Sequence, residues 1–445
     1  MRTRQTIRDV RGAVGQRVRL SLPGFGHRRC QANMALAPGG LQSHASTSTS
    51  PPQHTVICGG GVIGAACAFY LAEMGLASRV TLVEREGVAC AASGKAGGFL
   101  ALDWNDSGPS RELSRTSYAL HAELADIFGA ERIGYRAVNT LSVAAVERGL
   151  GSGMASPPGR KLLPHWVDGP VVAAAGMGSK KTTAQVHPAL LTHALVDSAV
   201  ERGAKLMTAT VTGLQLGPTD NAVTGVHVTS SSAAGGVAQE VLAADAVLLA
   251  MGPWTDVAAA RWGLPLPRIT GTKYHSVVLQ PDPLQPQATA DCLFTQFEYK
   301  SGREAEPEVY PRPDGTVYVC GEPQGLPLPD TAAQVTVDEG LAANVLQAAH
   351  CLSSLLRGAH VAAKQACYLP NAPDGIPVIG CVPDHPGVFV ATGHTCWGIL
   401  NAPATGKACA ELIAHGQAKT VDLTRFQPNR FMEGARPMVK KSARA

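Results

Sequence analysis

The segment from His54 to Glu84 constrains the fold more than any other part of the chain. HTVIC is a short β-branched run, and directly after it come glycines with the spacing G-x-G-x-x-G, at Gly59, Gly61 and Gly64. The apolar run AACAFYLAEMG then continues with helical spacing, and RVTLVE is a second strand that ends on an acid. Strand, tight turn, helix and strand in this order predict the βαβ unit that binds a dinucleotide.

Each residue of the turn has a separate role in this prediction. Gly59 permits the tight turn, Gly61 lets the backbone approach a pyrophosphate, and Gly64 lets the helix pack closely on the strand. Val62 and Ile63, between Gly61 and Gly64, are also predicted cofactor contacts, and the free N–H groups at the helix N-terminus meet the phosphate charge.

The acid at the end of the second strand indicates which dinucleotide binds. Glu84 lies 20 residues after Gly64, where a carboxylate can accept hydrogen bonds from both ribose hydroxyls. An acid at this position disfavours a 2′-phosphate, so NADP is not expected and FAD or NAD remains. We include Arg85, the next residue, among the predicted cofactor contacts.

The rest of the chain predicts an α/β fold in which helices and strands alternate around an antiparallel region. Pro-Asp-Gly at 313–315 supplies the turn between two strands of that region. The predicted elements are a helix at 187–203, one strand over 204–216, a hairpin at 223–242, a buried strand at 244–252, antiparallel strands within 273–320, a helix at 338–356, a strand at 388–392 and a helix at 397–415.

Several separate motifs resemble the FAD-dependent D-amino-acid oxidase superfamily. They occur in the expected order over residues 54–420, and glycine oxidases, sarcosine oxidases and a subgroup of uncharacterised fungal and plant oxidoreductases belong to that superfamily. The motifs are GGGVIGAACAFYLA, VEREGVACAASGKAGGFLA, QVHPALL, ATVTGL, ADAVLLAMGPWT and GHTCWGILNAPATG. The resemblance implies that the dinucleotide is FAD, and it is more specific for fold and cofactor than for substrate.

The resemblance also implies a two-domain organisation. A Rossmann-like, doubly wound FAD-binding domain, discontinuous in sequence, is expected from residues 54–105, 181–255 and 366–420. A substrate domain built on an antiparallel sheet is expected from 106–180 and 256–365. Residues 1–53 are expected to be a transit peptide and linker, and 421–445 a C-terminal tail.

Further cofactor contacts follow from the resemblance by position. They comprise a loop running under the pyrophosphate toward the isoalloxazine, a contact to the adenine, a turn over the dinucleotide and a C-terminal turn at the flavin pyrimidine. In that order the residues are Ser93, Gly94, Lys95, Ala96, Gly97 and Gly98; Val211; Ala250 and Gly252; and Gly393, His394, Gly398 and Ile399. Lys95 can equally be a solvated loop lysine, and His394 is more simply a packed histidine than a catalytic one.

The substrate side departs from the pattern of the superfamily. Oxidases of this kind hold a substrate carboxylate with an arginine, and the matching position in ACYLPNAPDGIPVIG is Leu369. A leucine cannot offer the bidentate fork that a carboxylate needs, so ordinary amino-acid oxidation is in doubt. In PEVYPRPDG, Glu308, Tyr310 and Arg312 alternate and so share one face of a strand. Tyr310, Arg312 and His394 are therefore weak candidates for substrate contacts, and a solvent-facing polar edge is the alternative.

The cysteines predict neither a metal site nor a disulfide framework. There are eleven, an odd number, and none forms a C-x-x-C pair. Cys367 occupies the register at which sarcosine oxidase joins a cysteine sulfur to its flavin. A covalent flavin at Cys367 is thus one possibility, and a plain buried cysteine is the interpretation that we favour.

Charge is distributed unevenly between the start of the chain and the remainder. Residues 1–50 contain eight Arg, no Lys and a single acid, Asp9, which gives +7, so the remaining residues sum to −3 from the total of +4. A nucleic-acid binder needs basic charge on its folded body, and that class is excluded here. The Arg-rich, acid-poor start followed by a Ser/Thr/Pro stretch predicts targeting to a mitochondrion or chloroplast, with a disordered basic tail as the alternative. No apolar run is long enough for a membrane span.

These observations together predict a flavoenzyme. The expected reaction is dehydrogenation of a small amine or amino-acid-like substrate, with hydride transfer to flavin N5 and reoxidation by O2 or another acceptor. Two alternatives remain at this point. One is an FAD-dependent hydroxy-acid dehydrogenase on the same fold, and the other is a non-enzymatic binding or trafficking module that FAD stabilises.

Overall fold

The computed structural model describes residues 50–147, 158–231 and 237–432. A six-stranded sheet contains the predicted βαβ unit. Its strand order is β19 (Val378–Cys381), β20 (Val388–Thr392), β12 (Ala246–Leu249), β1 (Thr55–Cys58), β2 (Val80–Glu84) and β8 (Lys205–Thr208). All neighbouring strands are parallel except β19 and β20, which are antiparallel.

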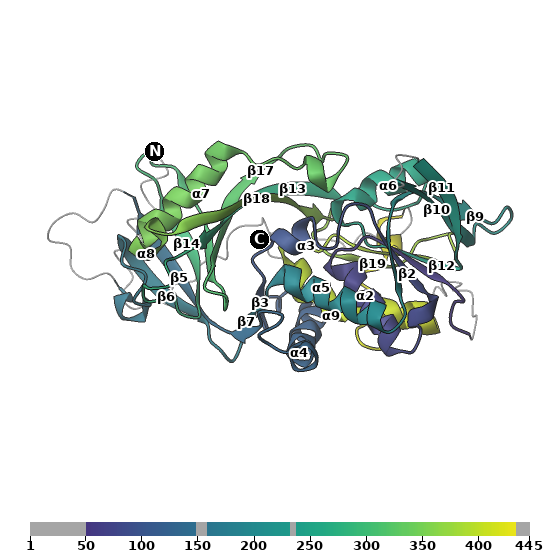
Figure 1. Ribbon diagram of the computed structural model, residues 1–445, viewed down its shortest axis with the longest axis horizontal. Helices are drawn as coiled ribbons and strands as arrows, with labels where there is room; N and C mark the ends of the chain where they lie inside the picture. Colours follow the sequence, from purple (N-terminus) through teal and green to yellow (C-terminus); the bar gives the residue numbers. More distant parts are fainter. Residues whose placement is uncertain (1–49, 148–157, 232–236, 433–445) are drawn as a thin grey trace, which may run out of the picture. The chain divides into compact units, whose positions relative to one another are not determined.

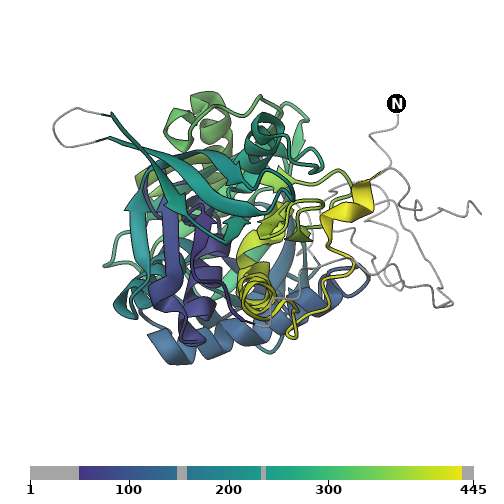
Figure 2. The same cartoon turned by 90° about the vertical axis from the view of Figure 1, so that its right-hand side faces the viewer.

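Helices cover one face of this sheet and a second sheet covers the other (Figure 2). Ile57 of β1 packs among the helices, whereas Val56 and Cys58 point to the opposite side because side chains alternate along a strand. The helices are α2 (Val62–Glu73), α4 (Arg111–Phe128), α5 (Pro188–Glu201) and α9 (Gly398–His415). The covering sheet consists of β9 (Thr210–Leu216), β10 (Val223–Ser231) and β11 (Val237–Ala243).

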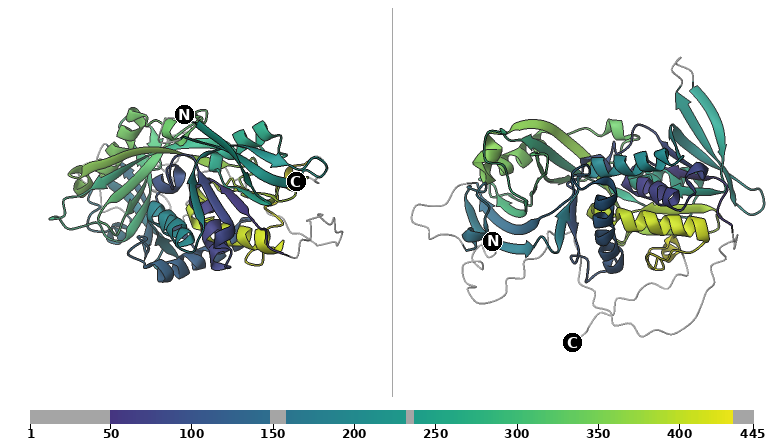
Figure 3. Two further views of the ribbon diagram at one scale, coloured as in Figure 1. Left: turned by 45° about the vertical axis from the view of Figure 1, so that its right-hand side comes forward. Right: turned by 60° about the horizontal axis from the view of Figure 1, so that its bottom comes forward.

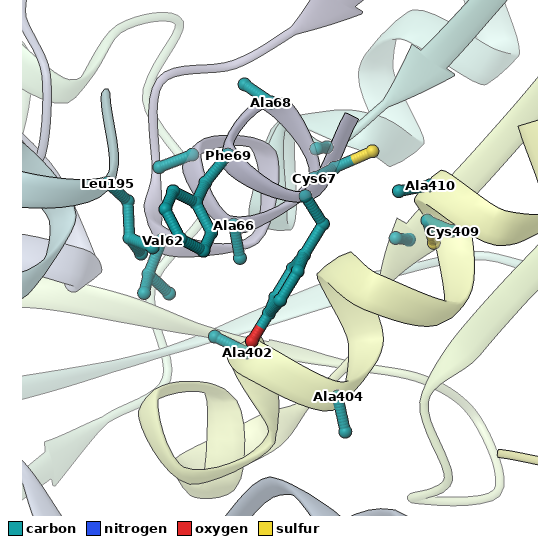
Figure 4. Close-up of a cluster of buried hydrophobic side chains, with 14 of the residues drawn as sticks. Val62, Ala66, Cys67, Ala68, Phe69, Leu195, Ala402, Ala404, Cys409 and Ala410 are labelled. Carbon is teal, nitrogen blue, oxygen red and sulfur yellow. The ribbon is translucent and has the colours of Figure 1, made fainter. Parts of the chain in front are cut away.

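Helices α2 and α9 cross closely, and small side chains make this possible (Figure 4). Ala66 and Cys67 of α2 face the α9 segment that contains Gly406. A Cβ atom at Gly406 would lie only 2.4 Å from the Ala66 Cβ, so no larger residue fits there. This contact sets how closely the middle of α9 approaches the middle of α2.

A second large sheet forms a separate layer (Figure 1). Its order is β18 (His360–Asn371), β13 (Thr270–Gln280), β17 (Val317–Gln324), β16 (Glu308–Pro311), β14 (Asp291–Glu298), β5 (Asn139–Val146) and β6 (Val171–Gly178), with β15 (Glu304–Ala305) beside β14. Helices α7 (Glu339–Leu352) and α8 (Ser354–Arg357) cover one face, where Val309, Val317 and Val319 are fully buried. The opposite face carries aromatic and polar side chains.

The face of the eight-stranded sheet opposite α7 and α8 contacts segments that lie near the glycine-rich turn. Strand β18 packs against α3 (Ala92–Lys95) and against the 3-10 turn η5 (Thr395–Trp397). A small sheet of β3 (Phe99–Ala101), β7 (Thr183–Gln185) and β4 (Arg136–Ala137) lies between the two large sheets (Figures 1 and 3). The candidate site is built where β18, α3 and η5 come together.

The predicted α/β fold is confirmed, with three differences in detail. The single strand expected over 204–216 is two strands in different sheets, because the chain leaves the parallel sheet at Ala209. The helix expected at 338–356 is interrupted at Ser353, whose extended backbone and hydroxyl begin α8 instead. The second large sheet is not wholly antiparallel, since β5 and β14 pair in parallel.

Two expected domain boundaries can be compared with the secondary structure. The limit between 365 and 366 falls inside β18, which continues to Asn371 as one strand. Within the expected tail, Val421, Leu423 and Phe426 are buried against the helical layer, while 433–445 lie outside the described residues, as do 1–49. No helix in the described ranges combines the length and hydropathy that a membrane span needs.

Candidate functional site

A cavity of about 500 Å³ lies at the carboxyl ends of β1 and β2. This is where ligands bind in open α/β sheets, because the loops that leave these ends can surround a ligand. Fourteen of the predicted cofactor contacts line it: Gly59, Gly61, Val62, Ile63, Glu84, Arg85, Ser93, Ala96, Val211, Ala250, Gly252, His394, Gly398 and Ile399. The structure thus brings together residues that are more than 300 positions apart in the sequence.

The three motif glycines have different surroundings. Gly59 has φ +112°, and a Cβ atom there would lie 2.5 Å from the Ala250 carbonyl oxygen. A Cβ atom at Gly64 would lie 2.1 Å from the Gly59 carbonyl oxygen. At Gly61 the nearest atom is the Ser93 Oγ at 3.0 Å, and this residue lines the cavity. Gly59 and Gly64 are therefore required by the turn itself, and Gly61 keeps the cavity open.

Glu84 holds the glycine-rich turn while it also lines the cavity. Its Oε2 accepts a hydrogen bond from the backbone N–H of Gly60 at 2.7 Å, and its Oε1 accepts one from that of Glu86 at 3.0 Å. Arg85 follows at the cavity wall and lies 3.8 Å from the Glu86 carboxylate. The carboxylate is thus fixed in position by the backbone before any ligand binds.

The loop at 93–98 closes over the start of α2. The Ser93 Oγ accepts a hydrogen bond from the Val62 N–H at 2.9 Å, which caps a first-turn donor of the helix. Gly94 and Gly98 do not line the cavity, and added Cβ atoms would lie 2.1 Å from the Ala89 oxygen and 1.9 Å from the Val186 oxygen. These two glycines shape the loop.

Four other predicted contacts also lie outside the cavity wall. Gly64 supports the turn, as described above. A Cβ atom at Gly97 would lie 2.4 Å from the Tyr310 ring, so Gly97 allows close packing. Gly393 has φ +76°, so it allows a turn. The Lys95 carbonyl accepts the Tyr318 hydroxyl at 3.0 Å, which ties the loop to β17.

One end of the cavity contains residues that the sequence did not single out. Val211 was predicted there, and Arg261 and Trp262 of α6 (Thr255–Trp262) join it at the wall. The Trp262 indole N–H donates to the Thr212 carbonyl at 3.0 Å, so α6 is held against β9. The only sequence signal for this contact is that a helix directly follows the predicted glycine turn at 252.

The other end is formed by β18 and η5. Leu369, Pro370, Thr395 and Cys396 line the cavity here, beside His394, Gly398 and Ile399. Leu369, the position at which the family resemblance would lead one to expect an arginine, is therefore an apolar part of the wall.

His394 is a neutral, buried side chain. It is 2% exposed, its Nε2 lies 3.1 Å from the Thr405 hydroxyl, and burial lowers its pKa to about 3. Its backbone also bridges to Asn371 of β18. The imidazole ring supports the turn at the cavity end and is uncharged at neutral pH.

The three alternating residues of the β16 hairpin do not form one shared group. Tyr310 donates its hydroxyl to the Glu308 carboxylate. Arg312 lies one residue past the end of β16, with its guanidinium 5.0 Å from the Tyr318 ring and 3.3 Å from the Ala96 carbonyl oxygen. Arg312 thus braces the loop at 93–98, and neither it nor Tyr310 lines the cavity.

Cys367 is a buried thiol. Burial raises its pKa to about 11, and the nearby Lys95 opposes the shift. It is 8% exposed and is not part of the cavity wall, whereas Leu369, two residues further along the strand, is. At neutral pH this side chain is a protonated thiol.

The cavity fits an extended dinucleotide. A backbone turn without side chains, a helix N-terminus and a fixed carboxylate lie at one part of the wall, and apolar residues form much of the remainder. Among the described residues no group of three or more His, Cys, Asp or Glu could hold a metal ion.

Comparison with known proteins identifies the family. The model of the family described as FAD dependent oxidoreductase (DAO) matches residues 54–412. A protein of Schizosaccharomyces pombe, described only as an oxidoreductase, is 34% identical over 408 residues, which cover 86% of this chain and all of that protein. The glycine oxidase of Geobacillus kaustophilus is 28% identical over 402 residues, covering 84% of this chain and 96% of its own.

Solved structures agree with this result. The crystal structure of the Geobacillus kaustophilus glycine oxidase covers 86% of this chain and 100% of its own, with a TM-score of 0.65 and 26% identity. Iminodiacetate oxidase from Chelativorans sp. BNC1 shares the fold at 20% identity, with a TM-score of 0.65 over 84% of this chain and 99% of its own. The chain belongs to the DAO family of FAD-dependent oxidoreductases, and its cofactor is FAD.

Proposed function

We propose that this protein oxidises a C–H bond next to nitrogen in a small amine or amino-acid-like substrate. The observation that carries the proposal is the cavity itself, which continues from the glycine-rich turn to a wall made by β18 and η5. When bound, FAD supplies a two-electron acceptor that takes the hydride at N5 and passes the electrons to O2 or another acceptor. Glycine oxidases among the relatives act on a small amino acid, which supports this substrate class.

The cofactor is proposed to occupy the cavity with its ribose at Glu84 and its pyrophosphate at Gly61 and the first turn of α2. The flavin end is then at Leu369, Cys396 and Ile399. Here the first N–H groups of α9 provide partial positive charge, since they have no partner within the helix. The predicted contacts that line the cavity are proposed to touch FAD, and those that do not are proposed to shape the loops around it.

The protein's own part in the reaction is to bind, orient and exclude water. Leu369 and Ile399 present apolar surface at the reacting end, which keeps water away from the transferred hydrogen. His394 is neutral and bonded to Thr405, so it supports the wall and is not a general base.

The expected domain division is retained as a proposal. Residues 54–105, 181–255 and 366–420 are proposed to bind FAD, and 106–180 and 256–365 to provide the substrate side. The six-stranded and eight-stranded sheets support a division of this kind.

Oxygen consumption by the purified protein tests the proposed reaction. A panel of primary amines, secondary amines, amino acids and hydroxy acids is supplied, and we expect turnover only with the nitrogen compounds. Turnover with hydroxy acids alone would make the chain a hydroxy-acid dehydrogenase. Tightly held FAD without turnover, by oxygen or by an added dye acceptor, would favour a binding module.

We also propose that residues 1–53 direct the protein to a mitochondrion or chloroplast. The support is their composition, with eight Arg and one acid in the first 50 residues. A fluorescent fusion of the full chain should enter one of these organelles, and the same fusion without residues 1–49 should not. Equal import of both fusions would contradict the proposal.

A further inference from the structure

Glu308 lies on the face of the eight-stranded sheet opposite α7, among aromatic and thiol side chains. Glu308 lies opposite Cys320 on β17 and opposite Phe294 on β14, so its side chain shares their face. Its Oε2 accepts hydrogen bonds from the Tyr310 hydroxyl and from the Cys320 thiol, the latter at 3.7 Å. Within the described part of the chain, no salt bridge reaches this carboxylate.

Glu308 adjoins the flavin end of the cavity. Cys396 lines the cavity, where its thiol is exposed, and the Glu308 carboxylate lies close enough to interact with that thiol. Burial raises the pKa of Tyr274 of β13, which pairs with Cys367, and the nearby Cys396 and Glu308 add to this rise. The carboxylate therefore lies near Cys396 at this end of the cavity, just outside the residues that line it.

Aromatic rings connect Glu308 to that wall. The Phe294 ring lies 5.8 Å from Tyr310, 5.0 Å from Phe99 and 5.0 Å from Trp104, and the Trp104 ring lies 6.4 Å from Trp397. Trp397 follows Cys396 directly in η5. Glu308, Phe99, Trp104 and Trp397 are all partly exposed, so solvent reaches this surface. A carboxylate bordered by aromatic rings is suited to bind a cation.

A half-buried carboxylate without a basic partner is costly to keep ionised. Burial is the main cause that raises the Glu308 pKa, while Tyr310 and Cys320 lower it and Glu306 adds to the rise. The other titratable groups close to the Glu308 carboxylate are Tyr274, Cys292 and Cys396. None of these is a base that carries positive charge, so a cationic ligand would be the missing partner.

We propose that Glu308 binds the ammonium group of the substrate, and that the substrate is a cationic amine without a carboxylate. Leu369 stands where a group that attracts a carboxylate was expected, and Glu308 supplies the opposite charge beside the same end of the cavity. This inference rests on the proposed function, because it names the substrate class for the same site.

Binding of phenethylamine, measured by perturbation of the flavin spectrum, tests the inference. Phenylalanine is the same molecule with an added carboxylate, and 2-phenylethanol is a neutral analogue. We expect the wild-type protein to bind phenethylamine more tightly than either. Glu308→Gln should weaken phenethylamine binding by about 10- to 100-fold, the range for a charge-assisted hydrogen bond, and leave 2-phenylethanol binding unchanged.

A control variant and a second measurement accompany this test. Glu306→Gln removes an exposed acid two residues away and should leave phenethylamine binding unchanged. If Glu308→Gln loses flavin, the pH dependence of the wild type replaces it, and the affinity for phenethylamine should rise as Glu308 ionises, up to the amine's own pKa.

The outcomes separate this inference from the proposed function. Equal phenethylamine affinity in Glu308→Gln and the wild type, or tighter binding of phenylalanine than of phenethylamine, would overturn the role of Glu308. Amine oxidation could then still occur, and the proposed function would stand. Glu308-dependent binding without any reduction of the flavin would instead support this site and contradict the proposed reaction.

Discussion

A Cβ atom at Gly64 would lie 2.1 Å from the carbonyl oxygen of Gly59, so the first and last glycines of the turn are packed against each other. Gly61, between them, faces the cavity. One motif therefore contains positions with two different roles, which substitutions can separate.

We expect Gly64→Ala to destabilise the protein by about 1–3 kcal/mol, because its methyl group overpacks the turn. Gly61→Val should instead give folded protein that lacks FAD, since the side chain occupies the path of the pyrophosphate. Thermal unfolding and the flavin-to-protein absorbance ratio measure the two effects. Full flavin occupancy in Gly61→Val would contradict the assignment of this turn.

The pH dependence of stability should reflect His121, which is fully buried in α4. Its Nε2 donates to the Ile399 carbonyl at 3.0 Å, and burial lowers its pKa to about 4. In the unfolded chain the pKa is about 6.5, so only the unfolded state gains this proton as the pH falls below that value. The stability is present above about pH 6.5 and falls by about 3 kcal/mol toward pH 4.

Urea unfolding between pH 7 and pH 4 measures this contribution. His121→Asn should show a smaller loss of unfolding free energy than the wild type over that range, although it is less stable at pH 7. His193→Asn, at an exposed position of α5, is the matched control and should behave as the wild type. The same slope in all three proteins would show that His121 is protonated in the folded state.

Restoring an arginine at Leu369 should create carboxylate affinity at the cavity end. A partly buried guanidinium gains about 1.5–3 kcal/mol from a charge-assisted hydrogen bond, which corresponds to roughly 10- to 100-fold tighter binding of acetate or glycine. Leu369→Met keeps the apolar surface and serves as the control. If Leu369→Arg holds FAD and binds carboxylates no better, residue 369 does not face the substrate.

Acid precipitation shows whether the flavin is covalently bound. We expect the yellow colour to stay in the supernatant, because burial raises the Cys367 pKa to about 11 and disfavours the thiolate that would form a bond to the flavin. A yellow pellet from the wild type that becomes colourless in Cys367→Ser would establish the covalent bond instead.

Local sequence order was sufficient to predict several residues that the structure brings together at one cavity. The turn at 59–64, Glu84 and the start of α9 are each defined by short-range patterns of glycine, helix and strand. Family resemblance added Ser93 and Val211, which reach the cavity from distant segments. Arg261 and Trp262 could not be predicted, because their position depends on how α6 packs against β9.

Strand alternation predicted the positions of only some of the candidate substrate residues. It correctly placed Glu308 and Tyr310 on one face, where the structure shows their hydrogen bond. It failed for Arg312 because β16 ends at Pro311 and the turn begins there, with the Arg312 N–H bonded to the Thr316 carbonyl at 2.7 Å. The absence of a basic partner for Glu308 among the described residues depends on neighbours from β13, β14 and β17, which a sequence pattern cannot show.

Anaerobic reduction of the bound flavin tests the central claim most directly. The purified protein should be yellow, and an excess of phenethylamine added without oxygen should bleach the visible absorbance band of the oxidised flavin. Lactate at the same concentration should leave the band unchanged. Bleaching by lactate and not by the amine, or protein that carries no flavin at all, would contradict the account of an FAD-dependent enzyme acting next to nitrogen.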